Sequence, residues 1–149
     1  MIINENMIIL DLEAKDKESA ILELAKQALK EDKITSVDDF AKSVFEREKT
    51  YTTGVGNGIA IPHGKSDAVK EAMIVFGKSS HGIEWESLDG KPVNIIFLLG
   101  VPDKNVSDIH LKILSQLSRK LMNDEFVERL KMADAKDDVL EALSDINIE

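Results

Sequence analysis

The sequence predicts a single α/β domain in which helices pack on the faces of a small, mixed and mostly parallel β-sheet. Two continuous apolar runs of strand length, residues 72–76 and 93–99, are typical of strands that are covered on both faces. Segments with apolar residues at helical spacing precede and follow these runs. The chain has 149 residues, of which 43% are apolar, so we expect one domain with a sizeable core over residues 1–149.

The first half of the chain contains one predicted strand and two predicted helices. Residues 7–12 indicate a short strand. A helix follows with Asp16 as its N-cap, and its buried face is predicted from residues at helical spacing: Ala20, Ile21, Leu24, Ala25, Ala28 and Leu29. A second helix is expected to begin at Ser36 and to end near Lys49, because Ser36 and Asp39 have the spacing of a capping box.

The second half supplies most of the predicted sheet. Residues 59–61 indicate a short strand that Pro62 ends. The two apolar runs are separated by a predicted turn at 88–92, where Asp, Gly and Pro cluster. After a polar loop, a long helix is expected from about residue 107 to 122, and residues 125–143 are expected to form one or two short helices.

Composition and charge exclude several classes of protein. The chain has no cysteine, and therefore no disulfide and no thiolate nucleophile. Residues 1–6 lack the features of a signal peptide, and no apolar run reaches the roughly 18–20 residues of a membrane span. We therefore expect a soluble, cytoplasmic protein. The formal net charge of −9 opposes binding to nucleic acid and favours a partner with a basic face.

His63 is the first candidate for chemistry. It lies between Pro62 and Gly64, at the end of a short apolar run, so it is expected at a loop tip rather than on the packed face of an element. Imidazole, with an unperturbed pKa of about 6.5, is mostly neutral and nucleophilic at pH 7. Covalent group transfer is one of the few chemistries that use such a histidine.

The glycine-rich stretch before His63 is a candidate anion-binding loop. It does not fit a dinucleotide-binding fingerprint, because Ile59 replaces the last glycine and a helix precedes it instead of a strand. Glycines allow a bend with positive φ and also let an anion approach outward-facing backbone N–H groups. The candidate phosphoryl-loop residues are Thr53, Gly54, Gly56, Asn57, Gly58 and Gly64.

Three further residues could have either a functional or a purely structural role. His81 lies in a polar turn and is expected to be solvated. His110 is in the first turn of the long helix, where it is either a structural histidine or a group beside His63 at a helix end that attracts anions. Arg47, near the end of the second helix, is either a solvated partner of glutamates or a bidentate ligand of phosphoryl oxygens. No third ligand accompanies the histidines, so no metal site is expected.

A long sequence pattern surrounds His63. It begins at Glu48 and, after six free positions, continues through Val55-Gly56 and the run 59–64. In this pattern the chain resembles the enzyme IIA domains of the fructose/mannitol class, type 2, of the bacterial sugar phosphotransferase system. Further matching segments are residues 45–48, 82–85, 88–93 and 110–114. The resemblance covers about residues 7–143, and it is greatest to the fructose-type branch.

This resemblance implies a mannitol-type enzyme IIA fold and a phosphotransferase activity. His63 would be phosphorylated on Nε2 by the phosphohistidine carrier protein HPr, and would then pass the phosphoryl group to a cysteine of an enzyme IIB partner. His110 would support the transfer and Arg47 would stabilise the phosphoryl group. No cofactor is implied. The protein would reach the membrane peripherally, through enzymes IIB and IIC, during sugar uptake.

A second family branch provides the alternative function. The chain also resembles the nitrogen-type enzyme IIA proteins, which share the same histidine pattern. In those proteins phosphorylation serves as a signal that changes the binding of protein partners. The two functions belong to different classes, one a carrier enzyme and the other a regulatory interaction protein.

Overall fold

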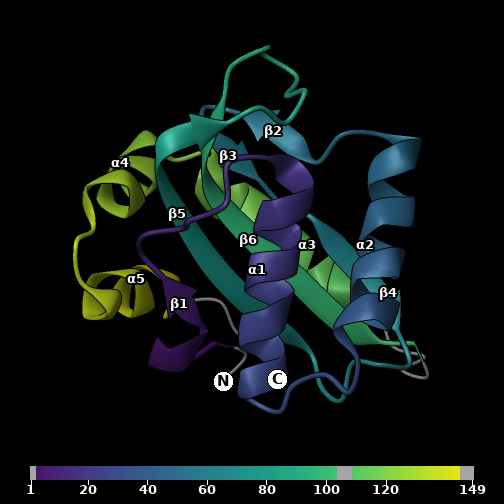
Figure 1. Ribbon diagram of the computed structural model, residues 1–149. Coiled ribbons are helices and arrows are strands. Elements are labelled where there is room, and N and C mark those ends of the chain that lie inside the picture. The colour runs from purple at the N-terminus through teal and green to yellow at the C-terminus, as the bar shows by residue number, and fades with distance from the viewer. Residues whose placement is uncertain (1–2, 104–108, 145–149) are drawn as a thin grey trace.

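A mixed β-sheet forms the middle layer of the molecule (Figure 1). The computed structural model describes the backbone of residues 3–103 and 109–144, and the side chains of residues 3–103 and 111–144. Within these residues the sheet has six strands in the order β1-β5-β6-β3-β2, and β4 also pairs with β6. The strands are β1 (Ile8–Ile9), β2 (Gly54–Gly56), β3 (Ile59–Ala60), β4 (His63–Ser66), β5 (Met73–Ile83) and β6 (Val93–Pro102).

Strand β6 organises the sheet. On one side it runs antiparallel to β5, where Phe76 lies opposite Phe97. On the other side it is parallel to β3 and then to β4. Strand β1 is parallel to β5, and β2 is antiparallel to β3. Three of these five strand pairs are parallel, so the prediction of a mixed, mostly parallel sheet is confirmed.

The two short strands β3 and β4 follow the same edge of β6 with a break between them. Ile59 and Ala60 pair with the first part of β6, and pairing resumes at His63. Pro62 lies in the break, where its missing N–H removes one donor from the ladder. Its carbonyl still accepts a hydrogen bond of 2.9 Å from the backbone N–H of Leu99. This break places His63 at the first position of a new strand.

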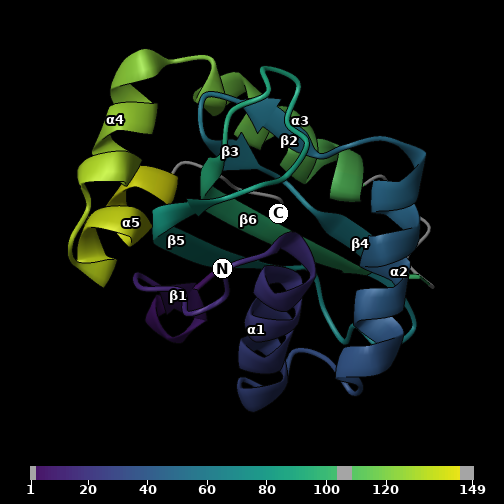
Figure 2. The same ribbon diagram turned by 45° about the horizontal axis from the view of Figure 1, so that its top comes forward.

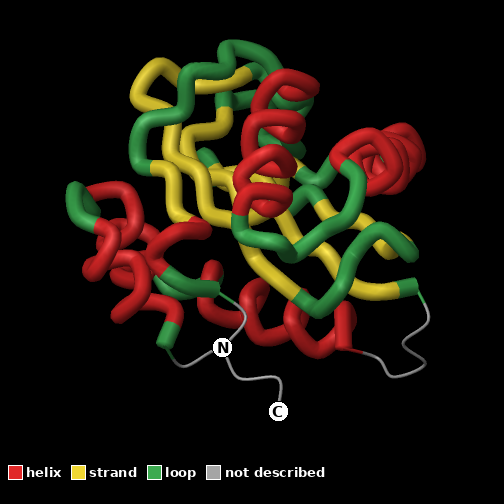
Figure 3. Tube along the Cα trace, turned by 60° about the horizontal axis from the view of Figure 1, so that its bottom comes forward, coloured by secondary structure: helices red, strands yellow, loops and turns green. Residues whose placement is uncertain are grey.

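Helices cover both faces of the sheet. Helix α1 (Lys17–Lys30) lies on one face and α3 (Ile109–Leu121) on the opposite face, as Figures 1 and 3 show. Helix α2 (Val37–Thr50) runs alongside β4, and α4 (Asp124–Met132) and α5 (Lys136–Leu143) lie at the other end of the molecule (Figure 2). A 3₁₀ turn, η1 (Glu5–Met7), precedes β1.

The predicted starts of the first two helices are confirmed by their caps. The side chain of Asp16 accepts a hydrogen bond of 2.8 Å from the N–H of Ser19. The hydroxyl of Ser36 accepts one of 3.1 Å from the N–H of Asp39. Each cap satisfies a backbone donor that the helix itself leaves unpaired.

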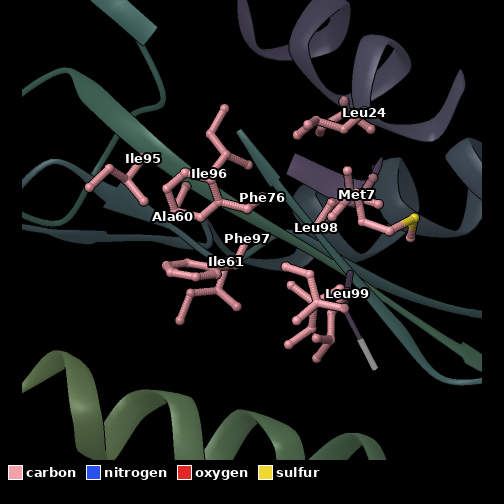
Figure 4. Close-up of a cluster of buried hydrophobic side chains, with 14 of the residues drawn as sticks. Met7, Leu24, Ala60, Ile61, Phe76, Ile95, Ile96, Phe97, Leu98 and Leu99 are labelled. Carbon is pink, nitrogen blue, oxygen red and sulfur yellow. The ribbon is translucent and has the colours of Figure 1, made fainter. Parts of the chain in front are cut away.

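The hydrophobic core lies on both sides of the sheet. In Figure 4, Phe97 and Leu99 extend from the sheet toward the green helix α3, and Leu24 of α1 closes the opposite side. Phe76 and Phe97 pack edge to face with ring centroids 5.4 Å apart. These side chains and Trp85 are fully buried, so the two long apolar runs are the centre of the core, as their pattern predicts.

Several predicted boundaries are wrong. The first strand covers only Ile8–Ile9, and the apolar runs belong to longer strands that extend to Ile83 and Pro102. Part of the glycine-rich stretch, expected as a loop, forms strand β2. The turn before β6 is confirmed by a hydrogen bond of 2.9 Å from the N–H of Gly90 to the carbonyl of Ser87. The expected helix start at residue 107 lies outside the described residues, which resume at 109.

The C-terminal segment folds as two short helices, α4 and α5, in agreement with the expectation of one or two. None of the helices in the described part of the chain is both long and apolar enough to cross a membrane.

Candidate functional site

A cavity of about 270 Å³ lies between helix α2 and the neighbouring strands β4 and β6. Three segments supply its walls. The lining residues are Ser43, Glu46 and Arg47 from α2, His63, Gly64 and Lys65 from β4, and Leu99 and Val101 from β6. The structure therefore brings three of the predicted site residues together: His63, Arg47 and Gly64.

His63 is half-buried at the start of β4, in register with Leu99 of β6. Its Nδ1 lies 2.9 Å from the backbone carbonyl oxygen of Ile61. A carbonyl oxygen can only accept a hydrogen bond, so Nδ1 must carry the hydrogen. In the neutral ring the lone pair then resides on Nε2, which is the nitrogen able to act as a nucleophile.

The segment that contains the Ile61 carbonyl, the acceptor for Nδ1 of His63, is itself held by hydrogen bonds. Ile61 is buried, and its N–H donates a hydrogen bond of 3.0 Å to the carbonyl of Thr53. The next carbonyl, of Pro62, accepts from Leu99. The orientation of the imidazole is therefore set by backbone groups on both sides of the Ile61–Pro62 break, and not only by the His63 rotamer.

Arg47 lies in the last turn of α2 and is half-buried. Its Nη1 donates a hydrogen bond of 2.7 Å to the carbonyl of Tyr51, just past the end of the helix. Because a guanidinium has five N–H donors in a planar fork, this contact anchors the group while the fork retains the geometry for bidentate anion recognition. Arg47 can thus present a fixed positive charge to the cavity that contains His63.

Three cavity residues were missed by the sequence reasoning: Ser43, Glu46 and Lys65. Helical spacing could have found Ser43, because positions i and i+4 share a helix face and Arg47 is four residues later. Strand alternation could have found Lys65, two residues after His63 on the same face. Together, Arg47 and Lys65 supply two cations against the single carboxylate of Glu46, so the cavity has a positive balance in an acidic chain.

Gly64 has a packing role at the cavity wall. A Cβ at this position would lie 3.1 Å from the backbone nitrogen of Val44 and 2.9 Å from its Cγ2, and it would also collide with the hydroxyl of Ser43. Helix α2 therefore approaches β4 so closely that only glycine fits. This contact brings Arg47 within reach of the His63 cavity.

The other residues of the predicted anion loop do not line this cavity. Gly54–Gly56 and Ile59–Ala60 form a hairpin, and the two residues between the strands, Asn57 and Gly58, have positive φ values of 58° and 79°. Such a two-residue turn is typical of a tight hairpin. Thr53 is buried, and its contacts are with neighbouring segments of the protein. These glycines therefore shape the hairpin, and of the predicted phosphoryl-loop residues Gly64 lies at the His63 cavity.

One outward N–H of the hairpin turn already has an anionic partner. The N–H of Asn57 donates a 3.0 Å hydrogen bond to Oδ2 of Asp89, and the N–H of Lys91 donates a 3.0 Å bond to Oδ1. These two backbone donors lower the pKa of the Asp89 carboxyl below its usual value. The carboxylate thus ties the hairpin to the turn before β6.

Of the two remaining histidines, the structure describes the side chain of His81 but not that of His110. His110 belongs to the first turn of α3, but its side chain lies outside the described residues. His81 is exposed, as expected, and its Nε2 lies 2.9 Å from the carbonyl oxygen of Ala14, to which it donates. His81 is therefore a surface residue that links β5 to the segment before α1.

Comparison with known proteins shows what this arrangement is similar to. The family model "Phosphoenolpyruvate-dependent sugar phosphotransferase system, EIIA 2" matches residues 1–146. The fructose-specific EIIA component of Haloferax volcanii is 39% identical over 130 residues, which are 87% of this chain and 84% of that protein. The fructose-specific EIIABC component of Bacillus subtilis is 33% identical over 143 residues, 96% of this chain, but the match spans only 22% of that longer protein.

Solved structures show the same fold. The nitrogen regulatory protein IIA-Ntr from Neisseria meningitidis has a TM-score of 0.88 and 33% identity, and the match covers 95% of this chain and 96% of that one. IIA mannitol from Escherichia coli has a TM-score of 0.80 and 24% identity, with 95% and 98% of the two chains covered. The expected mannitol-type enzyme IIA fold is thereby confirmed.

Proposed function

The chain belongs to the EIIA type 2 family of the phosphoenolpyruvate-dependent sugar phosphotransferase system, and from this premise we propose that it carries a phosphoryl group on Nε2 of His63. Members of this family are phosphotransferase components. The observation that supports the choice of atom is the hydrogen bond from Nδ1 of His63 to the carbonyl of Ile61. It assigns the lone pair of the neutral ring to Nε2.

The proposed reaction has two transfer steps. In the first, the Nε2 lone pair of His63 attacks the phosphorus of phosphohistidine on HPr, a new P–N bond forms, and the donor P–N bond breaks with its electron pair returning to the donor imidazole. In the second, a cysteine thiolate of enzyme IIB attacks the same phosphorus, a P–S bond forms and the P–N bond to His63 breaks. Nδ1 keeps its hydrogen bond to Ile61 throughout, so His63 needs no proton transfer.

The charged cavity residues support this chemistry electrostatically. A transferring phosphoryl group carries negative charge on its equatorial oxygens, and fixed donors near those oxygens stabilise the transition state. Arg47 and Lys65 line the cavity beside His63, and the side chain of Arg47 is anchored on Tyr51. We assign Arg47 the main stabilising role, because its fork suits bidentate contact with phosphoryl oxygens. For His110 we propose a supporting role, as the family resemblance implies.

The partners follow from the same proposal. We propose HPr as the donor and an enzyme IIB domain or subunit as the acceptor, with a fructose-type sugar as the transported substrate. The fructose-specific EIIA relative supports the sugar class, and the EIIABC relative, in which one name combines A, B and C, supports an association with IIB and IIC. We propose that the protein acts in the cytoplasm and reaches the membrane only through these partners. We also propose that residues 1–149 form a single domain.

A regulatory function is the second candidate. The likeness to IIA-Ntr from Neisseria meningitidis favours it, since that match covers the same share of this chain as the match to IIA mannitol and has a higher TM-score. In this case phosphorylation of His63 would control the binding of a protein partner. Passage of the phosphoryl group to a purified fructose-class IIB supports the carrier function, and labelling without onward passage to IIB proteins of any sugar class supports the regulatory one.

The direct test is phosphorylation by phospho-HPr. The wild type should gain one phosphoryl group that is acid-labile and base-stable, as expected of a phosphohistidine, and His63→Ala should gain none. His81→Ala is the matched control, because it removes an exposed histidine outside the cavity and should keep full labelling. Labelling of His63→Ala, or no labelling of the wild type, would refute the proposal.

A further inference from the structure

A continuous set of hydrogen bonds connects the buried carboxylate of Glu48 with His63. The hydroxyl of Thr53 donates to Oε1 of Glu48, and the N–H of Thr53 lies 3.4 Å from Oε2. The carbonyl of Thr53 accepts the N–H of Ile61 at 3.0 Å. The carbonyl of Ile61 accepts Nδ1 of His63 at 2.9 Å. Two residues, Thr53 and Ile61, therefore link a carboxylate at the end of α2 to the ring that we propose as the nucleophile.

The first part of this network is fixed by burial and by ion pairing. The side chain of Glu48 is 6% exposed, and its Oε2 lies 3.2 Å from Nζ of Lys17 in α1. The hydroxyl of Thr53, 4% exposed, also accepts a hydrogen bond of 3.3 Å from Nε1 of the buried Trp85. Its one hydrogen and one of its lone pairs are thus both in use. A polar network that is satisfied in this way inside the protein is rigid and costly to disturb.

We propose that Glu48 and Thr53 are positioning residues that set the tautomer and the aim of His63, which deepens the function proposed above and depends on it. Neither side chain lines the cavity, so neither touches the transferred group. Glu48 holds Thr53, and the backbone carbonyl of Thr53 accepts the N–H of Ile61, whose own carbonyl accepts from His63. If Thr53 moves, the carbonyl of Ile61 loses its fixed orientation, and Nδ1 of His63 loses the acceptor that selects its tautomer.

The same segment also holds Arg47. The turn after α2 is closed by the bond from Arg47 to the carbonyl of Tyr51 and by the bonds from Thr53 to Glu48. Glu48 therefore stabilises the conformation of residues 48–53, on which the anchor of the guanidinium depends. A single carboxylate in this position orients both the nucleophile and the cation of the proposed site.

The test is a pair of Thr53 variants. Thr53→Val keeps the shape of the side chain but removes the hydroxyl, and Thr53→Ser keeps the hydroxyl. We expect Thr53→Val to lower the rate of phosphoryl transfer from phospho-HPr by roughly tenfold, because small misplacements of a reacting group have effects of this order. In nitrogen-labelled protein, the imidazole chemical shifts should show more of the tautomer with hydrogen on Nε2. Thr53→Ser should keep the wild-type tautomer and rate.

Thr52→Val is the matched control for general loosening of the loop. The hydroxyl of Thr52 donates to the carbonyl of Trp85 at 3.0 Å and accepts the N–H of Gly54, so the variant loses bonds in the same loop without touching Glu48. It should leave the His63 tautomer unchanged. Equal shifts in Thr52→Val and Thr53→Val, or a wild-type tautomer and rate in Thr53→Val, would overturn the inference.

Glu48→Gln provides the second variant should Thr53→Val fail to fold. An amide can still accept the Thr53 hydroxyl, but its NH₂ group cannot accept the Thr53 N–H or pair with Lys17. The variant should shift the tautomer in the same direction and slow the transfer, and an unchanged tautomer would overturn the inference. The tautomer is measured without any donor protein, so a failure of wild-type phosphorylation refutes the proposed function separately from this inference.

Discussion

At the scale of single residues, the chemistry of the site depends on which nitrogen of one imidazole carries hydrogen. Sequence context predicts His63 at a loop tip, but the residue is half-buried at the first position of strand β4. The structure adds the acceptor of Nδ1, the carbonyl of Ile61. The next carbonyl, that of Pro62, instead accepts the N–H of Leu99 in β6. A residue two positions away thus supplies the acceptor that leaves the lone pair of the neutral ring on Nε2.

Arg47 allows a prediction at this scale. Arg47→Ala should lower the rate of phosphoryl transfer by about a hundredfold, the order found when one fixed donor to a transition state is removed. Arg47→Lys should recover only part of this loss, because an ammonium keeps the charge but not the bidentate fork. Single-turnover transfer from phospho-HPr measures both.

Lys49→Ala is the control for Arg47, because it removes a cation from the same last turn of α2 without removing a residue of the cavity. Its rate should equal that of the wild type. An Arg47→Ala rate within twofold or so of the wild-type rate would refute the stabilising role of Arg47. A Lys49→Ala rate as slow as that of Arg47→Ala would show that positive charge near the helix end, and not the fork, is what matters.

At the scale of elements, the β2–β3 hairpin shows how a predicted loop became part of the sheet. Asn57 and Gly58 provide the positive φ values of a two-residue turn, and Asp89 ties this turn to the segment before β6. The pKa of Asp89 is lowered by the backbone N–H groups of Asn57 and Lys91. The carboxylate form is therefore favoured in the folded state relative to the unfolded chain.

This shift predicts a pH dependence of the stability of the hairpin. With a folded pKa below the unfolded value of about 3.9, the contribution of Asp89 is present above pH 4 or so and is lost as the pH falls through the folded pKa. Asp89→Asn should be less stable than the wild type at pH 7, and the difference should shrink as the pH is lowered below 4 or so. Denaturant unfolding at a series of pH values measures this difference.

Asp67→Asn removes an exposed aspartate from another turn and controls for the loss of one negative charge. Its difference from the wild type should be smaller at pH 7. A difference between Asp89→Asn and the wild type that stays constant down to the acid transition would contradict the assignment of the contacts with Asn57 and Lys91.

At the scale of the whole molecule, the site exists because a helix and a strand from different parts of the chain come into contact. Helix α2 carries Arg47 and strand β4 carries His63, and the cavity lies between them. The approach is set by Gly64, where any Cβ would meet the backbone of Val44 and the hydroxyl of Ser43. A chain with net charge −9 thereby places two cations, Arg47 and Lys65, in the cavity that His63 also lines.

Gly64→Ala tests this packing. We expect it to lower the free energy of unfolding by about 1–3 kcal/mol, the range of overpacked sites, and to slow phosphoryl transfer by separating α2 from β4. Chemical denaturation of Ser43→Ala, Gly64→Ala and the double variant completes a double-mutant cycle. Because Ser43→Ala removes one of the colliding atoms, the double variant should lose less than the sum of the single losses. Additive losses would contradict a direct clash between these residues.

The sequence by itself determined the fold class, the two capped helices, the buried strands and the candidate nucleophile. These depend on local patterns: apolar runs, cap spacing and the Pro-His-Gly context, which act over a few residues along the chain. It also indicated Arg47 as a candidate site residue. The proposed role of Arg47 depends on the contact between α2 and β4, which no local pattern specifies.

Only the tertiary structure decided how those residues meet. It placed Lys65, Ser43 and Glu46 in the cavity with His63, put the glycines before His63 in the β2–β3 hairpin, and linked Glu48 to the imidazole through Thr53 and Ile61. The physical reason is that hydrogen bonds and close packing between distant segments depend on the register of β6 with β3 and β4. Periodicity within a segment indicates which face is buried, and so disfavours a one-residue slip, but it does not specify which residues of a distant strand are its partners.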